Sequence, residues 1–153
     1  MSEWRLPWSA SCICGQVQMR VTKPPLVSMA CHCTGCQKLT SGPYSISFLV
    51  PSDGFEVTRG EPVTGGLHRE HKQYYCPHCK GWVFTRPAGM DFVNFRPTLL
   101  EDASWVRPFV DIAAAEKLPG VESGAEMSFD GFPGPEDFPP IMAAFSERGA
   151  RPA

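Results

Sequence analysis

The seven cysteines of this 153-residue chain fall into three tight clusters, and each cysteine lies within two intervening residues of another. The clusters are CICG at 12–15, CHCTGC at 31–36 and CPHC at 76–79. In a reducing compartment structural disulfides are rare, and an odd number of cysteines leaves one thiol over. The spacing therefore favours metal ligation, which would hold distant parts of the chain together in one fold.

The first and third clusters together supply the four thiolates of a closed zinc site. In an extended strand residues i and i+2 share a face, so Cys12 and Cys14 can direct both sulfurs to one ion. A disulfide between them would close a small, strained ring. Pro77 favours the turn that brings Cys76 and Cys79 together, at the spacing of a zinc knuckle. The sequence predicts a structural zinc that joins two strands roughly sixty residues apart.

The middle cluster leaves Cys31, Cys33 and Cys36, and three protein ligands with an open fourth position are the usual arrangement of catalytic zinc. Two alternatives remain open: one structural zinc with three free thiols, or a closed second site with His32 or His78 as a further ligand. Because alternation along a strand directs such a histidine away from the sulfurs, we expect both to be solvated loop residues. A disulfide framework is disfavoured in a cytosolic chain.

Composition and charge exclude several classes of protein. The chain has 14 Lys and Arg against 16 Asp and Glu, which leaves no basic surplus for a phosphate backbone, so we expect no nucleic-acid partner. The N-terminal residues contain no apolar signal region, and no run approaches the roughly 18 apolar residues of a membrane helix. We therefore expect a cytoplasmic protein with no membrane partner.

Short segments of alternating polarity predict a mainly β fold of packed antiparallel sheets. In 16–21, Val17, Met19 and Val21 share one face, as in a half-buried strand. Further strands are expected at 27–32, 44–50, 55–60, 72–76, 81–86, 90–96 and 107–112. Short helical turns are expected at 34–40, 99–104 and 139–147, the last with Ile141, Met142 and Phe145 on one face.

Two regions differ in composition. Residues 1–119 are expected to form one zinc-binding domain, and 120–153 a C-terminal extension rich in glycine, proline and acidic residues. Such termini are often poorly ordered. Because this extension keeps several phenylalanines, the alternative is that it docks its aromatic side chains on the domain.

The cysteine motifs resemble those of a known family. The order CxCG, CHCxxC and CPxC, with an aromatic residue before the last motif, is similar to the glutathione-dependent formaldehyde-activating enzyme family, also called the centromere protein V family. The resemblance covers 12–105 and implies a β-tent of packed antiparallel sheets stapled by two zinc ions per chain. It implies a structural zinc at Cys12, Cys14, Cys76 and Cys79, and a catalytic zinc at Cys31, Cys33 and Cys36.

The resemblance also implies an activity. It is that of a carbon–sulfur lyase similar to S-(hydroxymethyl)glutathione synthase, acting on an adduct of glutathione, or another thiol, with a small aldehyde such as formaldehyde. A thiolate-rich zinc is suited to take a further sulfur ligand. The rival interpretation is a non-enzymatic, zinc-stapled binding module.

Residues beyond the cysteines are harder to assign. The carboxylates of a glutathione adduct would need cations, for which the candidates are Lys38, Arg69, Lys72, Arg86 and Arg96. The acid or base of the reaction is unknown, with His68 and His71 near the third cluster as residues to test. Lys80 stands where the family usually has glycine, which would move the tight turn after Cys79 onto Gly81.

Overall fold

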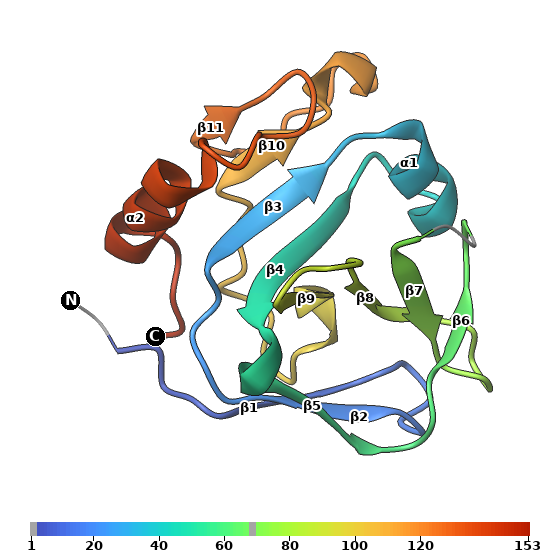
Figure 1. The fold of residues 1–153 in the computed structure, drawn as a ribbon. Coiled ribbons are helices and arrows are strands. Elements are labelled where there is room, and N and C mark those ends of the chain that lie inside the picture. Colours follow the sequence, from blue (N-terminus) through green and yellow to red (C-terminus); the bar gives the residue numbers. More distant parts are fainter. Residues whose placement is uncertain (1–2, 68–69) are drawn as a thin grey trace. The chain divides into compact units, whose positions relative to one another are not determined.

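The computed structural model describes residues 3–67 and 70–153, and most of its regular elements are strands (Figure 1). The strands are β1 (Trp8–Ser11), β2 (Gln18–Val21), β3 (Val27–Cys31), β4 (Ser45–Pro51), β5 (Phe55–Arg59), β6 (Val63–Gly65), β7 (Lys72–Tyr75), β8 (Trp82–Arg86), β9 (Phe92–Phe95), β10 (Val110–Ile112) and β11 (Met127–Ser128). The helices are α1 (Thr34–Thr40) and α2 (Phe138–Arg148), with 3-10 turns η1 (Ser52–Gly54), η2 (Pro97–Leu99) and η3 (Ala114–Glu116). The predicted mainly β class is confirmed.

The helices lie close to their predicted positions, with one exception. The helix α1 occupies the predicted residues 34–40, and α2 extends the predicted 139–147 by one residue at each end. The turn expected at 99–104 is instead η2, at 97–99. There the Asp102 carboxylate accepts hydrogen bonds from the backbone N and the Oγ of Ser104, a local turn that competes with a helix. Neither helix of the described ranges has the length and apolar character needed to cross a membrane.

The chain forms two compact units that are interleaved in sequence. The first unit consists of Leu26–Ser47 and Arg107–Ala150. The second consists of the described residues up to Pro25, Phe48–Val106 and Arg151–Ala153. The middle cysteine cluster lies in the first unit, and the other four cysteines lie in the second.

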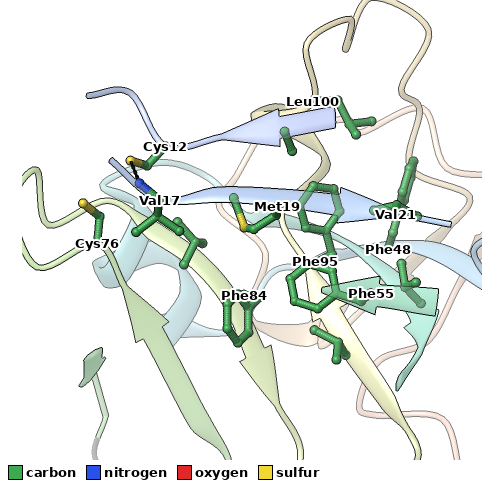
Figure 2. Close-up of a cluster of buried hydrophobic side chains, with 14 residues drawn as sticks. Cys12, Val17, Met19, Val21, Phe48, Phe55, Cys76, Phe84, Phe95 and Leu100 are labelled. Carbon is green, nitrogen blue, oxygen red and sulfur yellow. Dashed lines mark hydrogen bonds between the residues drawn. The ribbon is translucent and has the colours of Figure 1, made fainter. Parts of the chain in front are cut away.

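The second unit contains antiparallel sheets that pack around an apolar core. One sheet has the order β1-β2-β5, and in the other the second half of β4 pairs with β9, followed by β8, β7 and β6. Val17, Met19 and Val21 are buried on the predicted face and pack in one cluster with Phe84 and Phe95 of the other sheet (Figure 2). The core contains two cysteines, Cys12 and Cys76, at one end of the cluster.

The first unit departs from the expected antiparallel pairing. Strand β10 pairs in parallel with both β3 and β11, and lies alongside β3 in Figure 1. Parallel neighbours need a long connection, which the chain provides by building most of the second unit between β3 and β10. All residues of β3 are buried, as is typical of a strand covered on both faces.

The C-terminal extension contributes β11 and α2 to the first unit. Ile141 and Phe145, two of the residues expected on one helix face, are each 2% exposed. The ring of Phe145 packs edge-on against Phe109, with centroids 5.5 Å apart. Arg148 pairs with Glu126 at 2.7 Å, an exposed contact that adds little stability. Apolar burial therefore holds α2 in place.

Replacing Phe145 with alanine is expected to destabilise the protein by roughly 3–5 kcal/mol, the usual cost of emptying a buried phenylalanine site. The matched control is Phe132→Ala in the same extension, because Phe132 is 68% exposed and its loss should cost less than about 0.5 kcal/mol. Urea unfolding measures both. Equal, small effects would show that the extension does not contribute to the stability of the fold.

Candidate metal centres

The four thiols of the first and third clusters meet within the second unit. The Sγ atoms of Cys12, Cys14, Cys76 and Cys79 all lie within 4.8 Å of one another. Cys14 Sγ is 3.5 Å from Cys12 Sγ and 3.7 Å from Cys76 Sγ. Tetrahedral zinc with Zn–S bonds of about 2.3 Å separates its sulfurs by about 3.8 Å. The spacing of the sulfurs fits a closed tetrahedral site.

The CICG segment is a tight turn built around its first sulfur. Gly15 donates its N–H to the Cys12 carbonyl at 3.0 Å and has φ +79°, a conformation that glycine adopts at little cost. The Val17 N–H then donates to Cys12 Sγ at 3.3 Å (Figure 2). Such N–H···S contacts favour the thiolate, which is the form that binds metal.

The CPHC turn corrects one expectation from the sequence. Lys80, and not Gly81, takes the left-handed conformation, with φ +64°. Its N–H donates to the Cys76 carbonyl at 3.0 Å, and its Nζ donates to the Pro77 carbonyl at 2.6 Å. A left-handed lysine costs on the order of 1 kcal/mol more than glycine, and these two bonds offset that strain.

The thiols of the four-cysteine group differ in their pKa values. Burial raises the pKa of Cys12, but the Val17 N–H and the neighbouring thiols outweigh it and lower that pKa to about 6. The Gln16 N–H lowers the pKa of Cys14, but burial and the neighbouring thiols raise it to about 11. Once one thiolate forms, its charge disfavours a second. A divalent cation removes this repulsion, so the donor set fits a metal such as Zn²⁺.

The three thiols of the middle cluster meet within the first unit. The Sγ atoms of Cys31, Cys33 and Cys36 all lie within 4.8 Å of one another. Cys31 ends β3, Cys33 is the N-cap of α1 and Cys36 lies in the first turn of that helix. The Cys33 sulfur accepts the Cys36 N–H at 3.3 Å, and the Cys33 carbonyl accepts the Gln37 N–H at 3.0 Å. A strand end and a helix start thus bring the sulfurs together.

In this group, too, the thiols make it harder for one another to lose a proton. The contact with the Cys36 thiol, followed by burial, raises the pKa of Cys31, and burial raises the pKa of Cys33. A cation among the sulfurs would lower both. Within the described ranges no fourth His, Cys, Asp or Glu ligand atom joins this group. The arrangement suits a metal with three protein ligands.

His32 differs from the solvated loop residue expected from the sequence. It is 0% exposed, and its Nε2 lies 2.6 Å from Asp111 Oδ1 on β10. Its ring also lies 5.0 Å from that of Tyr44. Because the side chain is directed to Asp111, it does not close the three-sulfur group. His78 is exposed, as predicted.

An open hollow of about 410 Å³ adjoins α1 within the first unit. Its lining consists of Gln37, Lys38, Ser41, Gly42, Pro43 and Leu118. The first of these residues directly follows Cys36 in the sequence. Lys38 gives this open surface one cation beside polar and apolar side chains.

The other cations proposed for a glutathione carboxylate lie in the second unit or outside the described residues. The buried Arg96 stacks 4.0 Å above the Trp82 ring, and Arg86 lies 5.3 Å from the Phe84 ring. Both guanidinium groups contact aromatic side chains of their own unit. Lys38 is the predicted cation that lines the hollow.

The remaining candidates lie near the third cluster. Lys72 is an exposed residue of β7. His71 accepts the Ala88 N–H on Nδ1 at 3.0 Å, a partner from the loop that follows β8. His68 and Arg69 lie outside the described residues.

Two acidic residues near the middle cluster were not predicted. Asp111 interrupts the apolar strand segment FVDI, and a charged residue in such a segment is the sequence signal that could have identified it. Glu116 Oε1 accepts both the N–H and the hydroxyl of Thr34, at 3.1 and 3.2 Å. Glu116 therefore caps the start of α1 from a distant segment, for which the sequence offers no signal.

A mainly β chain with one four-thiol group and one three-thiol group belongs to the class of cysteine-rich proteins suited to binding metal ions. The profile of the glutathione-dependent formaldehyde-activating enzyme family matches residues 7–115. The chain therefore belongs to this family, as its motifs indicated.

No curated protein matches the chain significantly. A crystal structure of a protein from Rhodobacter sphaeroides, a structural genomics target, is similar to this chain at 16% identity and a TM-score of 0.49, covering 79% of this chain and 99% of that one.

Proposed function

We propose that this chain is a two-zinc, carbon–sulfur lyase-like enzyme acting on the adduct of a thiol, glutathione in the first instance, with a small aldehyde. In this proposal Cys12, Cys14, Cys76 and Cys79 hold a structural zinc. Cys31, Cys33 and Cys36 hold a catalytic zinc whose fourth position is open. The observation that supports this most strongly is the division of the thiols into a group of four and a group of three.

The donor set indicates which chemistry the second zinc would supply. Three thiolates on Zn²⁺ leave a net charge of about −1, which weakens Lewis acidity and favours a further soft sulfur ligand over water activation. The reaction joins the thiol sulfur to the aldehyde carbon and moves the thiol proton to the aldehyde oxygen, and the reverse reaction breaks the same bond.

The chain's own residues would bind and orient the rest of the substrate. The residues that line the hollow begin at Gln37, directly after Cys36 in the sequence. Among them Lys38 would offer a positive charge to a substrate carboxylate. Burial of Cys31, at 7% exposure, keeps one side of the sulfur group dry. An adduct with a carboxylate arm could therefore place that arm along α1 and its sulfur toward Cys33 and Cys36.

Native mass spectrometry of chain purified without chelator is expected to show two zinc ions, one of which becomes labile or gains a glutathione adduct when glutathione is added. In parallel, NMR exchange between formaldehyde, glutathione and their adduct should be faster with the enzyme than without it. The proposed enzymatic activity would be rejected if the chain held one tight zinc that did not respond to glutathione and if it did not accelerate exchange between the aldehyde, the thiol and their adduct. That result would favour the zinc-stapled binding module.

A further inference from the structure

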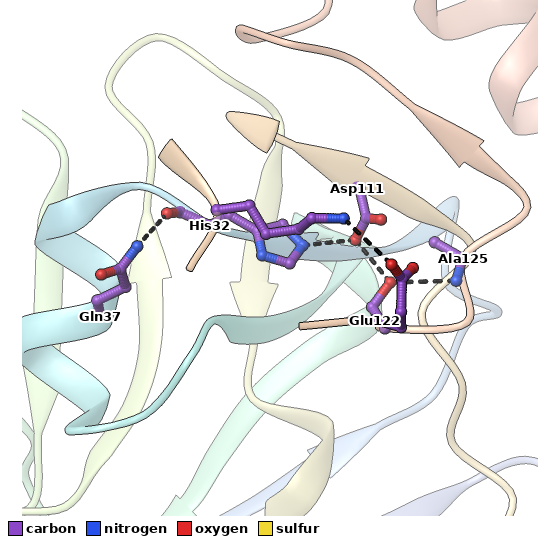
Figure 3. A network of polar contacts seen from close by, with 7 residues as sticks. His32, Gln37, Asp111, Glu122 and Ala125 are labelled. Carbon is purple, nitrogen blue, oxygen red and sulfur yellow. Dashed lines mark hydrogen bonds and ion pairs between the residues drawn. The ribbon is translucent and has the colours of Figure 1, made fainter. Parts of the chain in front are cut away.

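A buried polar network connects the loop of the middle cysteine cluster to β10 and the segment that follows it (Figure 3). His32 Nε2 donates to Asp111 Oδ1 at 2.6 Å, and Ser123 Oγ donates to the same oxygen at 2.7 Å. The Ala125 N–H in turn donates to Ser123 Oγ at 3.1 Å. The network lies within the first unit and has no part in the chemistry described so far.

His32 is held through its backbone as well as its side chain. Its N–H donates to the Ile112 carbonyl at 3.0 Å, and its carbonyl accepts from Gln37 Nε2 at 2.8 Å. His32 is the one residue between Cys31 and Cys33. A rotation of its backbone would therefore change the directions of the Cys31 and Cys33 sulfurs.

The network is costly to bury, which argues for a purpose beyond stability. Asp111 is 8% exposed and His32 is 0% exposed. A buried carboxylate loses its hydration, and only short, charge-assisted hydrogen bonds offset the free-energy cost of that loss. An apolar pair of similar volume often stabilises a protein as well as a buried ion pair. A directional bond, unlike apolar packing, fixes the orientation of the group that it holds.

We propose that Asp111 is a positioning residue, which fixes the loop between Cys31 and Cys33 through His32 and so sets the metal affinity of the three-cysteine site. This inference rests on the proposed function, because it assumes a metal at Cys31, Cys33 and Cys36. Partners outside the ligand shell commonly change metal affinity by about 10–100-fold.

The test measures zinc protection of each cysteine cluster in the full chain. Wild type and Asp111→Ala are equilibrated with buffered free Zn²⁺, treated briefly with an alkylating reagent, and analysed by peptide mass spectrometry. In Asp111→Ala the zinc concentration that protects Cys31, Cys33 and Cys36 should rise about 10–100-fold. Protection of the other four cysteines should not change. Asp111→Asn should restore much of the affinity, because its amide oxygen still accepts from His32 and Ser123.

Ser28→Ala is the matched control. Ser28 lies on the same strand as Cys31, is 0% exposed, and donates from Oγ to the Arg107 carbonyl at 2.7 Å. Its loss should lower stability without changing zinc protection of either cluster. If Asp111→Ala does not fold, Ser123→Ala provides the test, because it removes one bond to Asp111 and should weaken zinc protection of the three cysteines several-fold.

The outcomes separate the inference from the proposed function. If zinc fails to protect Cys31, Cys33 and Cys36 in the wild type, the catalytic zinc and this inference both fall. If the wild type is protected and Asp111→Ala, or Ser123→Ala in its place, behaves like Ser28→Ala, the inference alone falls. Equal loss of protection at both clusters would also overturn it, because that result would reflect general destabilisation.

Discussion

Cys76→Ser is expected to abolish stable folding, with loss of the cooperative thermal transition in circular dichroism. Cys76 is 0% exposed and lies in the core cluster of the second unit. With Cys12 and Cys14 it joins two segments that are distant in sequence. Structural zinc sites bind with apparent free energies of roughly 10–16 kcal/mol. The net stability of a domain is only about 5–15 kcal/mol, so loss of a zinc bound here would remove most or all of it.

The control for this variant lies beside the same four-thiol group, in its other cysteine segment. Ile13 stands between Cys12 and Cys14 and is 92% exposed, so Ile13→Ala should change stability by no more than about 0.5 kcal/mol. A chelator should reproduce the effect of Cys76→Ser in the wild type. A Cys76→Ser chain that melts within a few degrees of wild type would show that the four-thiol group does not staple the fold.

Cys33→Ala should have the opposite profile, with activity lost and the fold retained. Turnover of the thiol adduct should fall by a thousandfold or more, because a metal contributes several kcal/mol to catalysis and about 4 kcal/mol corresponds to that factor. Stability should fall little. The sulfurs of the middle cluster lie within six consecutive residues, so a metal bound there would close no long loop. The substitution removes the Cys36 N–H···S contact, worth about 1 kcal/mol.

Kinetics and a thermal melt on the same preparation check this expectation. Thr40→Ala is the control, because Thr40 is exposed on the same helix and its hydroxyl bonds the Cys36 carbonyl at 2.8 Å without offering a metal ligand. It should keep near-normal turnover. An unfolded Cys33→Ala would identify the middle site as structural, and a fully active one would remove these thiols from the mechanism.

The two cysteine groups could be predicted from the sequence because cysteines that share a metal ion lie at short, recognisable spacings. The CxC and CxxC spacings determine which sulfurs can share an ion, and the structure brings together the same four and the same three. Strand β3 and helix α1 were also predicted, at 27–32 and 34–40, within one residue of their observed limits. Which metal each group binds stays a prediction.

The long-range contacts could not be predicted. His32 and Asp111 are 79 residues apart, and no local pattern pairs one buried histidine with one acid in a short strand. The same holds for Glu116 and Thr34, 82 residues apart. The short strands β1, β6 and β11 were missed because each is paired by its neighbours and lacks a clear pattern of its own. Lys80 at φ +64° was missed because its own side chain supports a turn that glycine would normally make.

The interleaving of the two compact units has a consequence for the order in which the protein is made. All four thiols of the second unit leave the ribosome before Asp111 does, and chains begin to fold from the N-terminal side during synthesis. The strand that supports the middle cluster, β10, begins only at Val110. The four-thiol centre can therefore close on its ion while the loop from Cys31 to Cys36 still lacks Asp111. Zinc supply during translation would then affect the scaffold first and the three-cysteine site second.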